Sequence, residues 1–271
     1  MEIVSELIGK SKKIVLKIGS NVLSNSEGMV DQDTVKSIVD QVYHLISLGK
    51  QVIIVSSGAR ICGVGAINKW SRQGDINYKQ ALCAIGQVEL MMAYKGDFKE
   101  YDIHVAQILL TRDDFNDAKR NLNIRNTLFT LIDEGVVPII NENDTVSVEE
   151  IKIGDNDMMA ASTAALWNAD LLILMSDING LYDKSPKENE DALLIREVYD
   201  IEALTSSIDI GEKSDFGTGG IMTKIIAAKE MKKYGIPTIL VNGKNKGILT
   251  KSQTEKVDAT VFLATDSHSG R

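Results

Sequence analysis

The stretch KIVLKIGS, residues 13–20, is a run of aliphatic residues that ends in a glycine and a serine. Similar runs recur along the chain: QVIIVSSG (51–58), HVAQILLT (104–111), GVVPIINEND (135–144), ADLLILMSD (169–177) and IPTILVNG (236–243). Such near-continuous apolar runs are typical of strands buried on both faces, and therefore of a mainly parallel sheet.

Stretches with helical periodicity lie between these runs. Residues 30–50 place one apolar stripe on a helix that stops at Gly49: Val35, Ile38, Val39, Val42, Leu45 and Ile46. Residues 221–237 predict a second helix, which ends at Gly235 and Pro237. The alternation predicts an α/β sandwich with helices on both faces of the sheet. Residues 182–191 and 206–220 are interpreted as surface loops, the second one mobile.

The composition narrows the class of protein. The 271 residues are 44% hydrophobic and carry a net charge of −8, which argues against a nucleic-acid or anionic-membrane surface. The length fits one large domain or two modest lobes around one sheet. Cys62 and Cys83 have no metal-ligand spacing, and no apolar run has the length of a signal sequence or membrane span. The sequence therefore predicts a reduced, cytoplasmic protein.

Small and polar residues follow the predicted strands, at the edge where open α/β sheets bind ligands. Lys17 stands just before Gly19 and Ser20, so it is either a phosphate-binding cation beside free N–H groups or a lysine that reaches to water. Ser57 and Gly58 form a turn that opens a helix, which suits an anion but also fits an ordinary turn.

The segment NENDTVSVEEIKIGDND, residues 141–157, is rich in amides and carboxylates. It lacks the glycine and the closing glutamate of a calcium loop. Asn141, Asn143, Asp144, Asn156 and Asp157 could instead hold an α-ammonium and an α-carboxylate, or a carboxylate could orient a lysine. Farther on, the pair at 176–177 either seats a nucleoside or forms a plain turn.

The stretch GTGGIMTK, residues 217–224, has the composition of a phosphate loop but not the Walker pattern. We expect Lys224 in the first turn of the following helix, where the helix dipole disfavours a cation unless a polyanion binds there. The alternative is an exposed surface lysine. A dinucleotide site at residues 56–66 is disfavoured because Asn68 replaces the third glycine, and His44, His104 and His268 show no catalytic pairing.

Eight motifs occur together, in order and over nearly the whole chain: KIGSNVL, SSGA, ALCAIGQVELM, QILLTRDD, NENDTV, EIKIGDND, SDINGLY and GTGGIMTK. This set resembles the amino acid kinase family and, within it, the glutamate 5-kinase group. The resemblance implies a single domain, residues 1–271, without the C-terminal PUA domain of many bacterial members. It implies a three-layer αβα sandwich with a mainly parallel sheet of about eight strands. The N-terminal half would bind the amino acid and the C-terminal half the nucleotide.

The implied activity is ATP-dependent phosphorylation of the side-chain carboxylate of L-glutamate to L-glutamyl 5-phosphate, the first step of proline biosynthesis. Two alternatives stay open: another member of the family, resembling acetylglutamate or carbamate kinase, or a non-catalytic amino-acid-sensing module. A homo-oligomer, dimer or tetramer, and feedback inhibition by proline are further implications, with neither nucleic acid nor membrane as a partner.

The resemblance also implies site residues. The catalytic residues would be Lys17, Lys224 and Asp157. Glutamate would contact Ser57, Gly58, Asn141, Asp144 and Asn156. ATP would contact Lys17, Gly19, Ser176, Asp177, Thr218, Gly219, Gly220, Ile221, Met222, Thr223 and Lys224. Mg²⁺ would arrive with ATP rather than on protein ligands. Arg60 stands where relatives often have an apolar residue, which affects the expected glutamate side.

Overall fold

A computed structural model describes residues 3–25, 29–68, 74–147, 156–186, 188–207 and 220–264. Its helices are α1 (Ile3–Lys10), α2 (Ser20–Leu23), α3 (Gln32–Ser47), α4 (Ala59–Ile67), α5 (Ile76–Lys99), α6 (Arg112–Asn116), α7 (Ala118–Asp133), α9 (Asp157–Trp167), α10 (Ile201–Ser207), α11 (Gly220–Lys233) and α12 (Ile248–Lys251). Its strands are β1 (Lys13–Ile18), β2 (Gln51–Ser56), β3 (Val105–Leu110), β4 (Val137–Glu142), β5 (Leu171–Ser176), β6 (Leu181–Tyr182), β7 (Leu194–Ile195), β8 (Glu197–Val198), β9 (Thr238–Asn242) and β10 (Ala259–Phe262).

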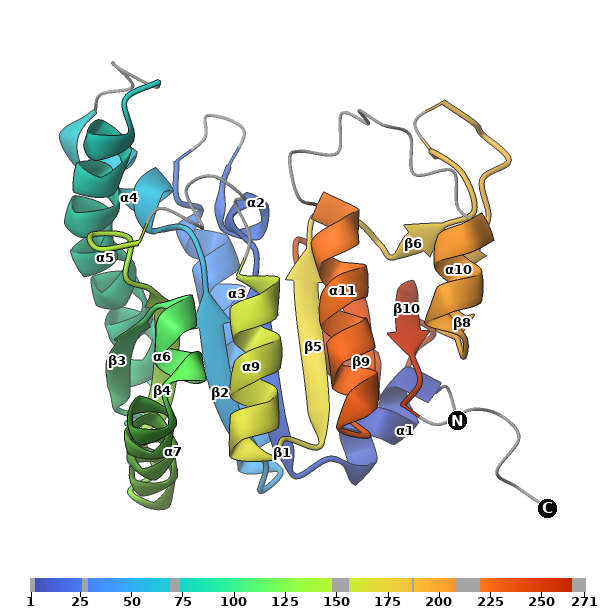
Figure 1. Ribbon diagram of the computed structural model, residues 1–271, viewed down its shortest axis with the longest axis horizontal. Coiled ribbons are helices and arrows are strands. Elements are labelled where there is room, and N and C mark those ends of the chain that lie inside the picture. The colour runs from blue at the N-terminus through green and yellow to red at the C-terminus, as the bar shows by residue number, and fades with distance from the viewer. Residues whose placement is uncertain are drawn as a thin grey trace.

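Eight strands form one twisted sheet in the order β3-β4-β2-β1-β5-β9-β10-β8, and β6 pairs with β7 separately (Figure 1). Within the large sheet only β9 and β10 pair antiparallel, and every other neighbour pair is parallel. The predicted, mainly parallel sheet of about eight strands is therefore confirmed, and all six predicted strands belong to it. The short strands β6, β7, β8 and β10 were not predicted.

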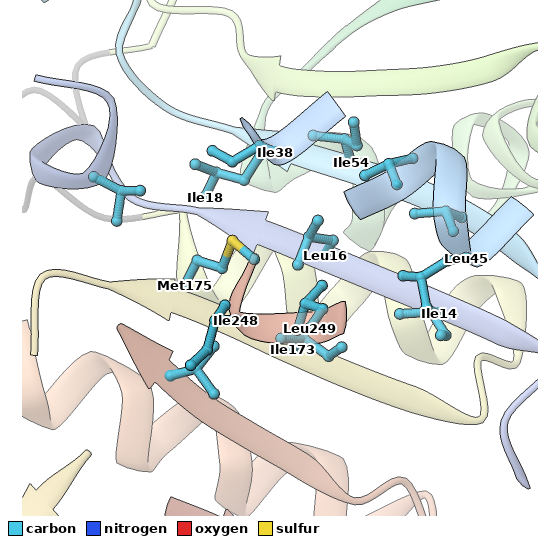
Figure 2. Packing of buried hydrophobic residues seen from close by; sticks show 14 of the residues in the cluster. Ile14, Leu16, Ile18, Ile38, Leu45, Ile54, Ile173, Met175, Ile248 and Leu249 are labelled. Atoms are coloured by element: carbon cyan, nitrogen blue, oxygen red, sulfur yellow. The ribbon is translucent and has the colours of Figure 1, made fainter. Parts of the chain in front are cut away.

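Each face of the sheet carries its own hydrophobic core. Helices α1, α3, α5 and α12 pack on one face, where Ile14, Leu16 and Ile18 of β1 meet Ile38 and Leu45 of α3 (Figure 2). Helices α7, α9, α10 and α11 pack on the other, with α9 and α11 side by side (Figure 1). The three-layer αβα sandwich is confirmed.

Strand β1 places a lysine on the face that α9 and α11 cover. Because side chains alternate along a strand, Ile14, Leu16 and Ile18 belong to the first core while Val15 belongs to the second. Lys17 is two residues after Val15, so its side chain points to the same face of the sheet as that of Val15. The chain runs from β1 to β2 on one side and later to β5 on the other, so β1 ends at the topological switch point where such sheets bind ligands.

The ends of two helices agree with their predicted signals. The side chain of Asp31 caps α3 by accepting from the N–H groups of Asp33 (3.1 Å) and Thr34 (3.3 Å). Gly49 follows this helix with φ +77°, and Gly235 follows α11 with φ +70°, a conformation that suits glycine. The predicted extents of both helices are confirmed to within a few residues.

Helices α4 and α5 approach each other through two glycines. A Cβ atom on Gly63 would lie 1.9 Å from the carbonyl oxygen of Leu82, and one on Gly86 would lie 1.8 Å from that of Ala59. Gly63, which a dinucleotide motif would have used, therefore serves close helix packing. Within the described ranges no helix combines the length and the apolar character that crossing a membrane requires, and this includes α5, the longest.

Candidate active site

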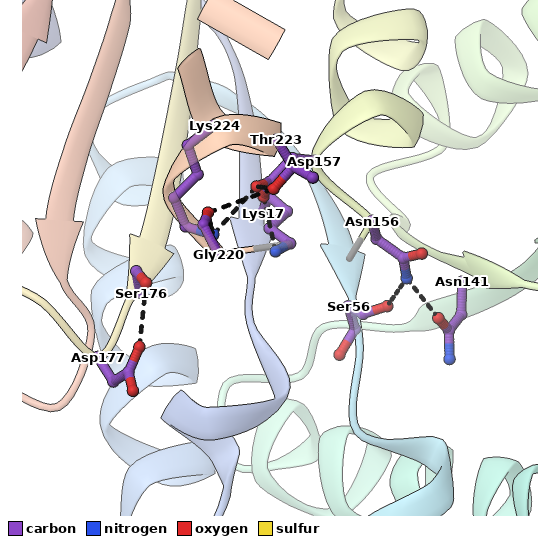
Figure 3. A network of polar contacts seen from close by, with 10 residues as sticks. All are labelled: Lys17, Ser56, Asn141, Asn156, Asp157, Ser176, Asp177, Gly220, Thr223 and Lys224. Atoms are coloured by element: carbon purple, nitrogen blue, oxygen red, sulfur yellow. Dashed lines mark hydrogen bonds and ion pairs between the residues drawn. The ribbon is translucent and has the colours of Figure 1, made fainter. Parts of the chain in front are cut away.

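Two lysines from distant parts of the chain bind one carboxylate at the carboxyl end of β1 (Figure 3). The Nζ of Lys17 lies 2.6 Å from Oδ1 of Asp157, the first residue of α9. The Nζ of Lys224, on α11, lies 3.1 Å from Oδ2 of the same carboxylate. We call these three residues the lysine–carboxylate centre.

The centre is removed from water and carries an excess of positive charge. The side chains of Lys17 and Asp157 are 2% and 0% exposed, and that of Lys224 is 6% exposed. Two ammonium groups face one carboxylate, so these three side chains together carry a net charge of +1 in a region where charges are weakly screened. The N-terminal ends of α9 and α11 add the positive ends of two helix dipoles. Such a place favours a bound anion.

Helix α11 begins at Gly220, so Lys224 is its fifth residue rather than part of its first turn, one position later than predicted. Its Nζ turns back to the helix start and donates to the carbonyl oxygen of Gly220 at 2.9 Å. The alternative of an exposed surface lysine is wrong. The hydroxyl of Thr223 donates to Oδ2 of Asp157 at 2.9 Å, and therefore helps to hold the carboxylate. Thr218 and Gly219 lie outside the described residues.

A network of side-chain amides begins at Asn156, the residue before Asp157, and extends to α5; Figure 3 shows its bonds from Asn156 to Ser56 and Asn141. The Nδ2 of Asn156 donates to the backbone oxygen of Ser56 at 2.9 Å and to Oδ1 of Asn141 at 2.8 Å. The Nδ2 of Asn141 in turn donates to Oε1 of Gln87 at 2.8 Å. The hydroxyl of Ser56 lies 3.0 Å from that of Tyr94, on the same helix as Gln87. Asn141 is thus tied to its protein neighbours on both ends of its amide.

Asp144 is a buried carboxylic acid beside this network. Burial raises its pKa to about 6, against the opposing effects of a hydrogen bond from Cys83 and the positive charge of Arg60. The group is therefore ionised at neutral pH and poised to accept a proton just below it. Arg60 stands where relatives often have an apolar residue. Its positive charge attracts the carboxylate of Asp144, which is one effect of this difference on the expected glutamate side.

Gly19 allows a close approach but does not offer a free N–H group. Its N–H donates to the carbonyl oxygen of Met175 at 3.1 Å, which joins the ends of β1 and β5. The expectation that this N–H is available to phosphate is wrong. A Cβ atom at Gly19 would lie 3.3 Å from that carbonyl oxygen and 3.8 Å from Nζ of Lys17. The glycine therefore keeps the space beside the lysine clear.

The turn at the end of β2 opens α4 as predicted, with one difference. Gly58 adopts φ +100° and precedes the first residue of the helix. The N–H of Ser57, however, donates to the carbonyl oxygen of Ile18 at 3.0 Å, so it is not among the N–H groups that this turn can offer to an anion. Ser57 is 2% exposed and lies next to the central strand end.

The residues expected at the nucleotide lie at the ends of β5 and α11. The hydroxyl of Ser176 donates to Asp177 at 3.2 Å, and the amide of Asn21 donates to the other oxygen of that carboxylate at 3.1 Å. On α11, Ile221 packs against the second core, whereas Met222 is 38% exposed. Whether any of them contacts ATP stays a prediction.

A sequence profile of the amino acid kinase family matches residues 12–242. The chain belongs to the amino acid kinase family. This amino acid kinase is 61% identical to the glutamate 5-kinase of Alkaliphilus metalliredigens over 261 residues, which are 96% of this chain and 99% of that one. It is also 61% identical to the glutamate 5-kinase of Alkaliphilus oremlandii, with 95% and 98% of the two chains covered. The similarity places it in the glutamate 5-kinase group.

Solved structures with the same fold are more distant in sequence. The UMP kinase of Ureaplasma parvum superposes with a TM-score of 0.63 at 17% identity, covering 94% of this chain and 99% of that one. An isopentenyl phosphate kinase superposes with a TM-score of 0.62 at 14% identity, covering 92% and 99%. At such identities the likeness shows the fold of this amino acid kinase and not its substrate.

Sequence reasoning about this amino acid kinase missed the contribution of α5. Gln80, Cys83, Gln87 and Tyr94 all contact the ends of β2 and β4 or the loop that follows. The available signal was their spacing, because positions i, i+3, i+7 and i+14 share one face of a helix. These four side chains carry polar groups, whereas the buried face of a helix is usually lined by apolar side chains.

Proposed function

We propose that this chain transfers the γ-phosphoryl group of ATP to the side-chain carboxylate of L-glutamate, forming L-glutamyl 5-phosphate and ADP, the first step toward proline. The observation that carries the proposal is the lysine–carboxylate centre, in which two buried ammonium groups exceed one carboxylate by a full charge. The 61% identity to glutamate 5-kinases supports the choice of acceptor.

The chemistry requires little beyond positioning and charge. A carboxylate nucleophile has a reference pKa of about 4.3, so at neutral pH it is already ionised and needs no general base. Catalysis then consists of holding the donor and acceptor in line and neutralising the charge on the transferring phosphoryl group. Preorganised ammonium groups in a water-poor site supply that neutralisation without reorganisation.

Each member of the centre has a distinct role in this proposal. Lys17 and Lys224 contact the phosphates from two sides and stabilise charge in the transition state. Asp157 forms ion pairs with both lysines and accepts a hydrogen bond from Thr223, so it orients the ammonium groups. Mg²⁺ would arrive with ATP on its β- and γ-phosphates, where it would neutralise further negative charge.

Glutamate would lie between the centre and α5. Asp144, ionised at neutral pH, and Oδ1 of Asn156 are acceptors suited to the α-ammonium group. Ser57 and Gly58 would border the acceptor from the β2 side, and Asn141 would position Asn156. ATP would lie over the ends of β5 and α11, next to Ser176, Asp177 and the segment from Gly220 to Lys224.

Three further features belong to the same proposal. Ile85, Val88 and Met92 of α5 are 38%, 58% and 62% exposed, an apolar stripe that supports a homo-oligomer. Proline carries the same α-ammonium and α-carboxylate as glutamate, which supports its role as a competing inhibitor. Cys62 and Cys83 are buried thiols that form no disulfide, in keeping with the reducing cytoplasm.

The test is ADP release measured with glutamate, aspartate, N-acetylglutamate, carbamate and UMP as separate acceptors, with hydroxylamine trapping of the acyl phosphate. We expect turnover with glutamate alone, and a loss of about a thousandfold in kcat for Lys17→Met and Lys224→Met because each removes a transition-state contact. Glutamate binding by calorimetry without ADP release would contradict the proposal and would favour an amino-acid-sensing module.

A further inference from the structure

Helix α5 presents one polar face to the carboxyl ends of two strands. The amide of Gln80 donates to the backbone oxygen of Asp144 at 2.9 Å, and Cys83 donates to its carboxylate. About one turn beyond Cys83, Gln87 contacts Asn141, and about two turns beyond Gln87, Tyr94 contacts Ser56. The close packing at Gly86 holds this face against α4. The motif ALCAIGQVELM, which contains Gln87, thus borders the site without yet having a role in it.

The orientation of every amide in the network follows from one backbone group. The N–H of Glu142 can only donate, and it lies 2.9 Å from Asn141, so the atom it meets is the oxygen Oδ1. The other end of Asn141 is therefore Nδ2, a donor, and the atom of Gln87 at 2.8 Å must be its oxygen Oε1. The Nε2 of Gln87, a donor, is therefore the last group in this series of hydrogen-bonded amides.

The network ends in a hydrogen-bond donor on one side and in a hydrogen-bond acceptor on the other, and neither has a hydrogen-bond partner in the described part of the chain. Gln87 is 8% exposed, its Nε2 is buried, and no hydrogen-bond acceptor in the described ranges reaches it. At the other end, Asn156 uses its Nδ2 for two bonds, and within the described part of the chain nothing donates to its Oδ1. An unmet buried donor is costly in a folded protein, so such a group indicates a missing partner.

We infer that the Nε2 of Gln87 binds the α-carboxylate of the amino-acid substrate; this rests on the function proposed above. The lysine–carboxylate centre stands at the Asn156 end of the network and attracts the reacting carboxylate. Gln87 stands at the far end, beyond Asn141, where the second carboxylate of glutamate arrives. Oδ1 of Asn156 and the carboxylate of Asp144 receive the α-ammonium between them. Gln87 thereby selects acceptors that carry both carboxylates.

The test combines a substitution with a trimmed substrate. Gln87→Glu keeps an oxygen for Asn141 but replaces the donor by a second acceptor, whereas Gln87→Met adds no charge and removes both the donor and the oxygen that accepts from Asn141. 4-Aminobutyrate is glutamate without its α-carboxylate. We expect both variants to raise the KM for glutamate about ten- to a hundredfold, with Gln87→Glu the more severe, while the KM for ATP stays unchanged. With 4-aminobutyrate, Gln87→Glu, which keeps the oxygen for Asn141, should not have a lower kcat/KM than the original chain.

Controls separate binding from folding and from the proposed function. Glu89→Gln changes an exposed position on the same helix and should leave both substrates unaffected. If Gln87→Glu loses kcat/KM equally for glutamate and 4-aminobutyrate, or loses none for glutamate, the inference is wrong although the proposed function stands. If the original chain fails to phosphorylate glutamate, the proposed function fails. Calorimetry of glutamate with the original chain and Gln87→Glu then decides the inference alone: equal affinities overturn it.

Discussion

The excess charge at the lysine–carboxylate centre predicts that two substitutions within it affect stability in opposite ways. Asp157→Asn removes the carboxylate that contacts both Lys17 and Lys224, and leaves two buried ammonium groups facing each other. Breaking a buried ion pair by deleting one partner costs about 3–5 kcal/mol in unfolding free energy. Lys17→Met instead removes the surplus charge and leaves the neutral pair of Asp157 and Lys224.

The expected result for Lys17→Met is a free energy of unfolding within about 1 kcal/mol of the original or above it. Methionine has nearly the shape of the lysine stem, and apolar replacement of buried charge is often neutral or stabilising. Turnover should nevertheless collapse. For Asp157→Asn we expect a loss of at least about 3 kcal/mol, which corresponds to a drop of about 6 °C or more in Tm.

Urea unfolding in phosphate-free buffer, paired with ADP release, measures both quantities. The double variant Lys17→Met/Asp157→Asn completes the cycle, and it should be more stable than Asp157→Asn alone because it contains one fewer buried cation. The reasoning is refuted if Lys17→Met destabilises the chain as much as Asp157→Asn does. Repeating the titration with phosphate should rescue part of the loss in Asp157→Asn, since an anion replaces the missing charge.

Three further predictions test other parts of the site. Burial raises the pKa of Asp144 to about 6. Below that pH, kcat/KM for glutamate should fall about tenfold for each pH unit. A pH profile of Asp144→Asn should lack this acidic decline. Gly86→Ala should lower Tm and raise the KM for glutamate, because its Cβ would lie 1.8 Å from the carbonyl oxygen of Ala59 in α4. Gly96→Ala, on the same helix, is the control: its Cβ meets nothing within 4 Å, so it should stabilise the chain slightly. Thr223→Val should lower kcat about tenfold with little change in Tm, because Asp157 loses one of its donors; unchanged kinetics would show that the hydroxyl does not position the carboxylate.

The fold was predictable where strands are long and buried on both faces. The runs at β1, β2 and β5 have no polar alternation to confuse them with surface strands, and each lies within one or two residues of its predicted bounds. Strand β10 has four residues and β8 has two, too few for any periodic pattern to emerge. Their pairing depends on tertiary contacts at the edge of the sheet.

The charged residues of the candidate site were predictable from the sequence, but the way they converge and the residues that surround them were not. A lysine next to a glycine turn is visible in the sequence, yet nothing in the spacing of Lys17, Asp157 and Lys224 indicates that they meet. Their convergence entered only through the family resemblance. Gln87 was missed because a single glutamine within a helical pattern looks like an ordinary exposed position, and its burial depends on the approach of α4 at Gly86.

The centre depends on the register of β1 more than on any single contact. Alternation directs Leu16 to one core and Val15 to the other, so the strand that fills the first core also delivers Lys17 to α9 and α11. A slip of one residue would exchange the two faces, placing an ammonium group among the aliphatic side chains beneath α3 and an aliphatic side chain against Asp157. The hydrophobic cost of that exchange is what keeps the ammonium group at the centre. The packing of the first core and the chemistry on the opposite face are therefore two consequences of the same strand.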